Sequence, residues 1–187
     1  MNSNFNHIFF KNCYTPLNES SYDTSNSQYL TTSTINSINY DKVTQYYCKN
    51  HKFECTMNSV DAIIKNSNGQ LVFIEFKNGD IDKKNIFEIK QKILFSILSF
   101  CDITKSDISN FRENNIFILV YNSQKDMIFL DKENESQSYH RIGLSFMRYA
   151  NLDYKRFGFN IYRGSCFKEI YTFNEKEFDN YLKEHCN

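Results

Sequence analysis

Two runs of apolar residues stand on either side of a turn-forming segment in the middle of the chain. The first run covers residues 59–65, the second covers residues 70–77, and residues 66–69 (Asn-Ser-Asn-Gly) join them. Both runs are rich in β-branched residues, and Asn and Gly are typical of tight turns. The pattern therefore predicts a β-hairpin.

The length of the turn decides which residues of this hairpin lie opposite one another. A two-residue loop would put Asp61 and Glu75 on opposite faces. A three-residue loop, in which a type I turn is followed by Gly69 in the left-handed conformation, pairs Asn66 with Gln70 instead. This second register puts Asp61 directly opposite Glu75, beyond an apolar stretch, and leaves the other face of the hairpin wholly apolar.

Hydrophobic periodicity predicts further elements on both sides of the hairpin. Apolar residues at helical spacing predict a helix over residues 84–101, and a continuous apolar run predicts a buried strand over residues 115–121. Upstream, the pattern allows an amphipathic helix that begins near Thr32 or Ser33 and ends at about Cys48. Downstream, we expect a short strand over residues 127–130, a helix over residues 137–152, a strand over residues 167–173 and a last helix beginning at Asn174, with Glu177 completing a capping box.

Length and composition favour one globular domain. The chain has 187 residues, of which 41% are hydrophobic and 24% are charged, and this is enough for one core. Residues 1–28 are mostly Asn, Ser, Thr and Tyr without a sustained period, so we expect an irregular N-terminal arm. Residues 29–187 are then a single α/β domain that ends in a C-terminal α/β extension.

Charge and cysteine usage limit the partners and the compartment. Lys and Arg number 22 and so do Asp and Glu, so a polyanionic partner must be met by a local basic patch. The six cysteines form no Cys-x-x-Cys pair, and we find neither a leader pattern nor a membrane span, which favours a reduced, cytoplasmic protein. The spacing of Cys48, His51 and Cys55 is similar to that of zinc ligands, but a fourth ligand does not follow at short spacing, so buried free thiols are the preferred interpretation.

The hairpin carries the residues with the clearest chemistry. Lys77 lies two positions after Glu75 and therefore on the same face of its strand. Two opposed carboxylates destabilise a sheet unless a cation lies between them. Their oxygen atoms are ligands that suit Mg²⁺ or Mn²⁺, while Lys77 could orient or deprotonate an attacking water. The open alternative is a structural ion pair in which Lys77 relieves the two acids.

This arrangement resembles the PD-(D/E)XK superfamily of restriction-endonuclease-like nucleases. The resemblance rests on Val60-Asp61, on Glu75-Phe76-Lys77, and on the helix and buried strand that follow. It implies an α/β fold with a restriction-endonuclease-like core, in which a central mixed sheet of four or more strands is flanked by helices. It also implies that Asp61 and Glu75 bind the metal ion with the Phe76 carbonyl, and that Lys77 is catalytic.

The same resemblance implies a first strand over residues 52–57, and the chain departs from the family pattern at three places. Val60 replaces the proline of the motif. The crossover helix carries Gln91 as the first residue of a Gln-x-x-x-Tyr pattern, with Phe95 in place of the tyrosine, so Gln91 is a further candidate. An acid on the first helix is expected in many members, and the upstream candidates are Glu19, Asp23, Asp41 and Glu54.

A basic and aromatic segment follows in residues 140–168. Its cationic residues that we expect to contact nucleic acid are Arg141, Arg148, Lys155, Arg156 and Arg163. Interleaved tyrosine and phenylalanine would stack on bases, although a solvated helix face over core aromatics explains the pattern equally well.

The sequence thus predicts a Mg²⁺- or Mn²⁺-dependent nuclease that hydrolyses phosphodiester bonds, with DNA favoured over RNA as the substrate. The alternative is a catalytically inactive module with the same fold, which binds a protein or nucleic acid partner. Either protein could act as a homodimer or with a protein partner.

Overall fold

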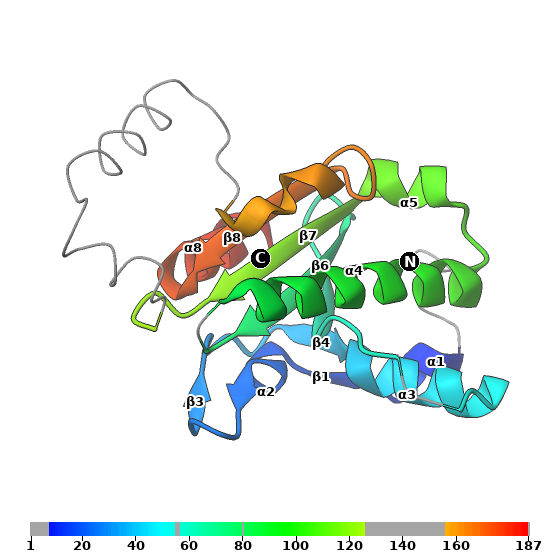
Figure 1. Cartoon of the computed structure of the whole chain (residues 1–187), viewed down its shortest axis with the longest axis horizontal. Coiled ribbons are helices and arrows are strands. Elements are labelled where there is room, and N and C mark those ends of the chain that lie inside the picture. The colour runs from blue at the N-terminus through cyan, green and yellow to red at the C-terminus, as the bar shows by residue number, and fades with distance from the viewer. Residues whose placement is uncertain (1–7, 55–56, 80, 126–155, 187) are drawn as a thin grey trace.

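The computed structural model describes residues 8–54, 57–79, 81–125 and 156–186. These residues form an α/β fold with a six-stranded mixed sheet and a separate two-stranded ribbon (Figure 1). The strand predicted over residues 127–130 and the helix predicted over residues 137–152 lie outside the described residues.

The central sheet has the strand order β1-β4-β5-β6-β7-β8. The pairs β1–β4, β4–β5 and β5–β6 are antiparallel, and the pairs β6–β7 and β7–β8 are parallel. The bounds are β1 (Tyr14–Pro16), β4 (Asn36–Asn39), β5 (Ala62–Lys65), β6 (Leu71–Lys77), β7 (Asn115–Tyr121) and β8 (Glu169–Asn174). The ribbon consists of β2 (Tyr22–Asp23) and β3 (Gln28–Tyr29).

Helices cover both faces of this sheet. One face packs against α3 (Tyr40–His51), α4 (Lys83–Thr104) and α5 (Ile108–Asn114), and the other face packs against α8 (Glu175–His185). The remaining helices are short: α1 (Ile8–Lys11), α2 (Leu17–Ser20) and the 3-10 segment η3 (Arg156–Tyr162).

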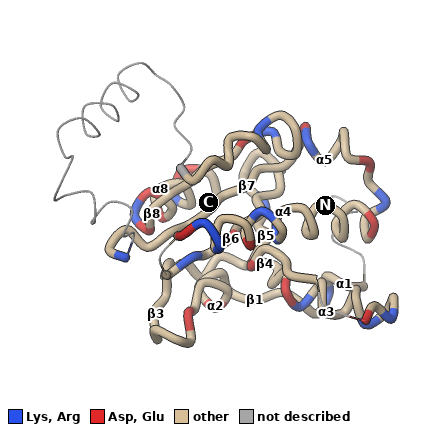
Figure 2. The backbone as a smooth tube through the Cα atoms, viewed as in Figure 1, with Lys and Arg blue, Asp and Glu red and all other residues tan. Residues whose placement is uncertain are grey.

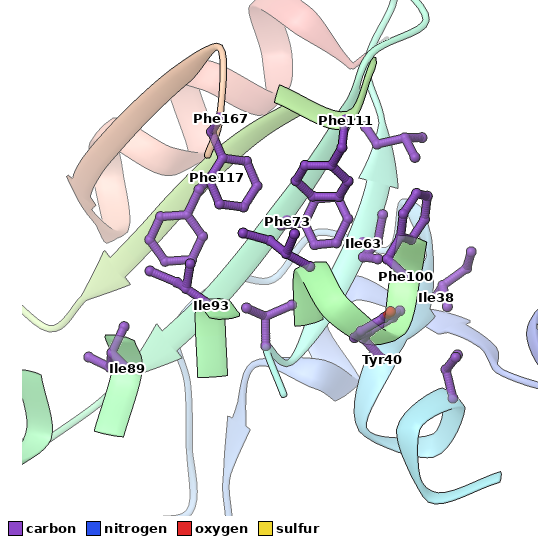
Figure 3. Packing of buried hydrophobic residues seen from close by; sticks show 14 of the residues in the cluster. Ile38, Tyr40, Ile63, Phe73, Ile89, Ile93, Phe100, Phe111, Phe117 and Phe167 are labelled. Atoms are coloured by element: carbon purple, nitrogen blue, oxygen red, sulfur yellow. The ribbon is translucent and has the colours of Figure 1, made fainter. Parts of the chain in front are cut away.

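An aromatic core joins α4 and α5 to the sheet. Phe73 of β6 contacts the rings of Phe100, Phe111 and Phe167 at centroid distances of 5.2 to 5.7 Å. Figure 3 shows these rings and Phe117 gathered over the strands. Because α4 is fixed by this packing, the first turns of α4 are held beside the end of β6.

The hairpin has the three-residue loop that the sequence favours. The N–H of Asn66 donates to the carbonyl of Gln70, and Gly69 has a φ of +80°. The ladder pairs Ala62 with Ile74 and Lys65 with Leu71, so the predicted register is confirmed for residues 62–65. Asp61 lies one position before this ladder, and its N–H donates to the carbonyl of Ile74, so it departs from the regular pairing with Glu75 that the sequence predicts.

Several other predicted elements are found where the pattern places them. The helix predicted over residues 84–101 is α4, which begins after the cap Asp82. The strand predicted over residues 115–121 is β7, and the strand predicted over residues 167–173 is β8, which begins two residues later. The capping box of α8 is present, with the Asn174 side chain accepting from the N–H of Glu177 and the Glu177 side chain accepting from the N–H of Asn174.

The predicted helix upstream of the hairpin was placed too early. It begins at Tyr40 and not near Thr32, because residues 36–39 form β4 and the Asn39 side chain caps the helix by accepting from the N–H of Lys42. β4 is also the antiparallel neighbour of β5, a place that the resemblance assigned to residues 52–57. Residues 52–54 and 57, the described part of that range, form no strand.

Residues 8–28, the described part of the predicted irregular arm, contain regular secondary structure. Residues 8–29 contain α1, α2 and three short strands, of which β1 extends the central sheet by pairing with β4. Phe10, Cys13 and Leu17 are fully buried and anchor the segment. Elements of two to four residues are too short to produce a hydrophobic period, so the sequence pattern does not show them.

Candidate metal site and active site

The two hairpin carboxylates come together at the end of β6. The N–H of Asp61 donates to the carbonyl of Ile74 at 3.0 Å, and the N–H of Phe76 donates to Oδ2 of Asp61 at 2.7 Å. Asp61 is therefore held where β5 begins, next to Glu75 on the face that α4 covers. Figure 1 shows this end of β6 beside the start of α4.

The cation between the two acids is Lys92 of α4. Its Nζ lies 2.7 Å from Oε1 of Glu75 and 3.2 Å from Oδ1 of Asp61. The side chains are 3% exposed for Glu75, 17% for Asp61 and 25% for Lys92, so the group is largely withdrawn from water. Lys77 was the cation that the sequence predicts for a structural ion pair, but Lys92 on the neighbouring helix fills this role.

The surroundings shift the pKa of all three groups. Burial raises the pKa of Glu75 well above its ordinary value of 4.5, and the nearby charge of Asp61 raises it further. Burial also raises the pKa of Asp61, against the opposing effect of Lys92. Burial alone would lower the pKa of Lys92, but the charges of Glu75 and Asp61 outweigh it, so the ammonium pKa is raised. The two carboxylates therefore favour the charged, hydrogen-bond-donating form of Lys92.

A third acid, Asp41, lies in the first turn of α3 and contributes to this electrostatic group. Its charge raises the pKa of both Asp61 and Glu75. Its Oδ1 accepts a hydrogen bond of 2.7 Å from the hydroxyl of Ser59. Asp41 is one of the four upstream acids that the sequence offers, and no local pattern distinguishes it from the other three. Asn39 was the signal that could have located Asp41, because a helix capped by Asn39 has residue 41 in its first turn.

The start of the hairpin is tied to α4 by one buried serine. The hydroxyl of Ser96 accepts a hydrogen bond of 2.9 Å from the N–H of Val60. Ser96 and Val60 are both fully buried. The position of Asp61 relative to Lys92 is therefore fixed from the helix as well as from the sheet.

The donor set fits a small hard cation in part. Within the described residues, Oε2 of Glu75 is buried and has no hydrogen-bond partner, so one carboxylate oxygen is left unsatisfied by the protein. Because the N–H of Phe76 is directed to Asp61, alternation along the strand directs its carbonyl to the same side. The described residues contain no cluster of three His, Cys, Asp or Glu side chains suited to a metal. One or two carboxylates are nevertheless the usual protein share of a Mg²⁺ site that also binds substrate phosphate.

Lys77 and Gln91, unlike Lys92, make no described contact with the two acids. Lys77 is half-buried at the end of β6, and no ion pair to it is seen in the described part of the chain. Gln91 is half-buried on α4 and makes no hydrogen bond to Asp61 or Glu75 there. The catalytic roles of both residues stay predictions.

A hollow of about 610 Å³ opens beside Asp61. Its lining comes from α2, the ribbon, the end of β6 and the start of α4. The residues are Ser20, Ser21, Tyr22, Asp23, Ser25, Asn26, Leu30, Asp61, Phe76, Lys77, Asn78, Gly79, Asp82 and Asn85. The hollow is a place where a substrate could reach Asp61 and Lys77 together.

The predicted nucleic-acid-binding residues are mostly outside the described structure. Arg141, Arg148 and Lys155 lie there, and so does the side chain of Arg156. Arg163 pairs with Glu169, with Nε 3.0 Å from Oε2. Cys55 of the zinc-like spacing also lies outside the described residues, while Cys48 is buried on α3.

Surface charge and the comparisons with known proteins add little about the partner. Figure 2 shows acidic and basic positions interspersed over the described elements. Every helix in the described ranges is too short or too polar to cross a bilayer. The chain matches no protein-family model, no curated protein and no solved structure.

Proposed function

We propose that the protein is a divalent-metal-dependent nuclease that hydrolyses phosphodiester bonds, with DNA favoured over RNA. Asp61 and Glu75 would hold Mg²⁺ or Mn²⁺, and the Phe76 carbonyl would be a third ligand. The observation that carries the proposal is the juxtaposition of two largely buried carboxylates, one just before β5 and one on β6, and one of them has an oxygen without a described partner. A buried acid pair with raised pKa values is typical of functional sites.

The topology around the acids supports a restriction-endonuclease-like core as part of this proposal. Antiparallel strands β4, β5 and β6 are followed by the long helix α4 and by β7, which is parallel to β6. In this arrangement, Asp61 precedes β5, and Glu75 and Lys77 end β6. The position of α3 between β4 and β5 differs from the order that the resemblance implied, which has its first helix before the three strands.

The residues have separable roles in the proposed reaction. Water forms a new bond to phosphorus and gives up a proton to solvent, the bond from phosphorus to the leaving nucleoside oxygen breaks, and the leaving oxygen gains a proton from solvent. A bound divalent ion would supply Lewis acidity to the phosphate and lower the pKa of water. Lys77 would donate to a phosphate oxygen in the hollow, where positive charge offsets the charge of the transition state. Lys92 keeps Asp61 and Glu75 together by binding both.

One observation favours the alternative, a non-catalytic module. Lys92 already contacts both acids, as a structural ion pair would, and it occupies the space between them. A metal ion would have to share this space or displace the ammonium. In the module, Asp61 and Glu75 would contribute to stability only.

Cleavage assays separate the two functions. Labelled single-stranded DNA, double-stranded DNA and RNA are incubated with wild type, Glu75→Gln and Asp61→Asn at increasing Mg²⁺ or Mn²⁺. If the protein is a nuclease, we expect metal-dependent cutting by wild type that falls by at least about 10²-fold in Glu75→Gln and in Asp61→Asn. Glu113→Gln, which changes an exposed acid on α5, is the control for preparation and contaminating nuclease. Absence of cutting by wild type, or equal cutting by all variants, would contradict the proposal.

A further inference from the structure

The hollow beside Asp61 contains one feature that the proposed chemistry does not use, an exposed pair of tyrosines on the ribbon. Tyr22 and Tyr29 pair across β2 and β3, and their ring centroids are 4.6 Å apart with an interplanar angle of 40°. The two residues are 39% and 45% exposed, and Tyr22 lines the hollow. An accessible aromatic face of this kind is a stacking surface for a base.

The ribbon is tied to the strand end that carries Lys77. The amide Nδ2 of Asn78 donates to Oδ2 of Asp23 at 2.9 Å, and the amide of Asn122 donates to Oδ1 of Asn78. Asn78 is the residue after Lys77. The stacking surface of Tyr22 is therefore held at a fixed place relative to Lys77.

Charge divides the hollow into two parts. Asp23 lies on the ribbon and stays ionised, because hydrogen bonds from Asn26 and from Asn78 lower its pKa. Lys77 is the cationic residue of the described lining. Asp23 and Asp82 repel a phosphate and Lys77 attracts it, so the phosphate belongs at the end of β6, where a metal ion held by Asp61 would offset the charge of that carboxylate. The ribbon side, with an aromatic ring, amide groups and hydroxyl groups, suits a neutral base.

We propose that the hollow holds one unpaired nucleotide, with its base stacked on Tyr22 and its phosphate beside Lys77 and Asp61. The preferred substrate is therefore a single strand or an unpaired end, not the body of a duplex. This inference rests on the proposed function, since it names the substrate class of the same site. A hollow of about 610 Å³ is of the size that takes one small ligand. A base inside a duplex cannot reach such a surface without leaving its stack.

Binding measurements test the inference independently of cleavage. Fluorescein-labelled dT8, rU8, an abasic octamer and a blunt hairpin duplex are titrated with protein, with Ca²⁺ in place of Mg²⁺, and their integrity is checked on a gel. Wild type is compared with Tyr22→Ala, with Tyr22→Phe and with Tyr46→Ala. Tyr46 is the matched control, because it is an exposed tyrosine on α3 that lines a different hollow.

The inference expects wild type to bind a single strand about tenfold more tightly than the duplex or the abasic octamer, and Tyr22→Ala to lose about this factor. Tyr22→Phe keeps the ring and should remain within about twofold of wild type, as should Tyr46→Ala. The comparison of dT8 with rU8 tells which sugar is accepted, and dependence on Tyr22 with either strand supports the inference. Equal binding of single strand and duplex, equal binding by Tyr22→Ala, or no binding of any probe would overturn it.

The two proposals fail separately in these experiments. Metal-dependent cutting that requires Glu75 but is unaffected by Tyr22→Ala would keep the nuclease and reject the base site. Single-strand binding that requires Tyr22, in a protein that cuts nothing, would keep the base site and reject the nuclease. Circular dichroism of Tyr22→Ala, compared with Tyr22→Phe, shows whether the ribbon change has disturbed the fold.

Discussion

Lys92 reaches from α4 to Glu75 on β6, and its Nζ lies 2.7 Å from Oε1 of a side chain that is 3% exposed. The other oxygen of Glu75 has no hydrogen-bond partner in the described part of the chain. A purely structural ion pair would gain from satisfying both oxygens, because a buried unsatisfied acceptor costs free energy. The geometry is thus that of a site in which a lysine satisfies only part of a carboxylate pair.

Replacing Lys92 separates a structural cation from a metal competitor. Lys92→Met leaves two buried carboxylates without their cation and should lower the free energy of unfolding by about 3–5 kcal/mol in EDTA. If the acids bind metal, Mn²⁺ should raise the melting temperature of this variant more than that of wild type, because ligand binding to the native state stabilises it. Thermal unfolding with and without Mn²⁺ measures both effects.

Lys84→Met is the control for this experiment. Lys84 is on the same helix, is 83% exposed and lies 3.9 Å from Glu88, so its loss should change stability by less than about 0.5 kcal/mol. A Lys92→Met protein as stable as wild type, or one that Mn²⁺ leaves unchanged, would argue against an acid pair that binds metal.

The raised pKa of Glu75 predicts a pH dependence of stability. A carboxyl whose pKa is higher in the folded state stabilises the protein fully below its unfolded pKa, near 4.5, and this contribution is lost as pH rises through the folded pKa. Glu75→Gln lacks the titration. In EDTA, the stability of this variant relative to wild type should therefore rise with pH above 4.5.

Urea unfolding of both proteins between pH 4 and pH 8 measures this difference. Glu113→Gln, an exposed change, serves as the control for removing one acid. A constant difference between Glu75→Gln and wild type over the whole range would mean that burial does not perturb Glu75.

Lys77 should matter for activity and little for stability. Its side chain is half-buried and has no ion pair in the described structure, so Lys77→Met should leave the urea midpoint close to that of wild type. Cleavage should fall by about 10²-fold or more, because a donor to the transition-state charge is lost. Lys77→Arg, which keeps the charge, should retain more activity than Lys77→Met, and equal activity of all three proteins would remove Lys77 from the mechanism.

Gly69 maintains the register that brings the acids together. Its φ is +80°, and a Cβ added there would meet Cε of Lys65 at an ordinary 3.7 Å, so Gly69→Ala is opposed by backbone strain and not by a clash. We expect a loss of about 1–2 kcal/mol in unfolding free energy. Gly79→Ala is the control, because a Cβ there meets nothing within 4 Å and its φ is not in the left-handed region. Equal stability of the two variants would contradict this account of the turn.

The sequence predicted best where local patterns are long or where a turn dictates pairing. The hairpin register follows from Asn66 and Gly69, and α4 and β7 follow from uninterrupted apolar patterns. Local chemistry was equally sufficient for the capping box of α8, because it is made by neighbours in the chain.

The remaining features depend on contacts between distant parts of the chain. The pairing of β1 with β4 joins two strands of three and four residues, which no periodicity reveals. Lys92 lies on α4 at a position where the sequence pattern alone indicates a lysine exposed to solvent. Only the packing of that helix on β6 brings it to Glu75. Asp41 was missed as part of the site for the same reason, since α3 begins eight residues later than expected.

The central claim is that Asp61 and Glu75 bind a divalent metal ion, and Mn²⁺ binding measured by electron paramagnetic resonance tests it most directly. Free Mn²⁺ is quantified while wild type, Asp61→Asn, Glu75→Gln and Glu113→Gln are titrated at neutral pH. The account predicts saturable binding of one Mn²⁺ by wild type and by Glu113→Gln, weakened at least about tenfold in each of the other two variants. Absence of saturable binding by wild type, or binding that survives both substitutions, would contradict it.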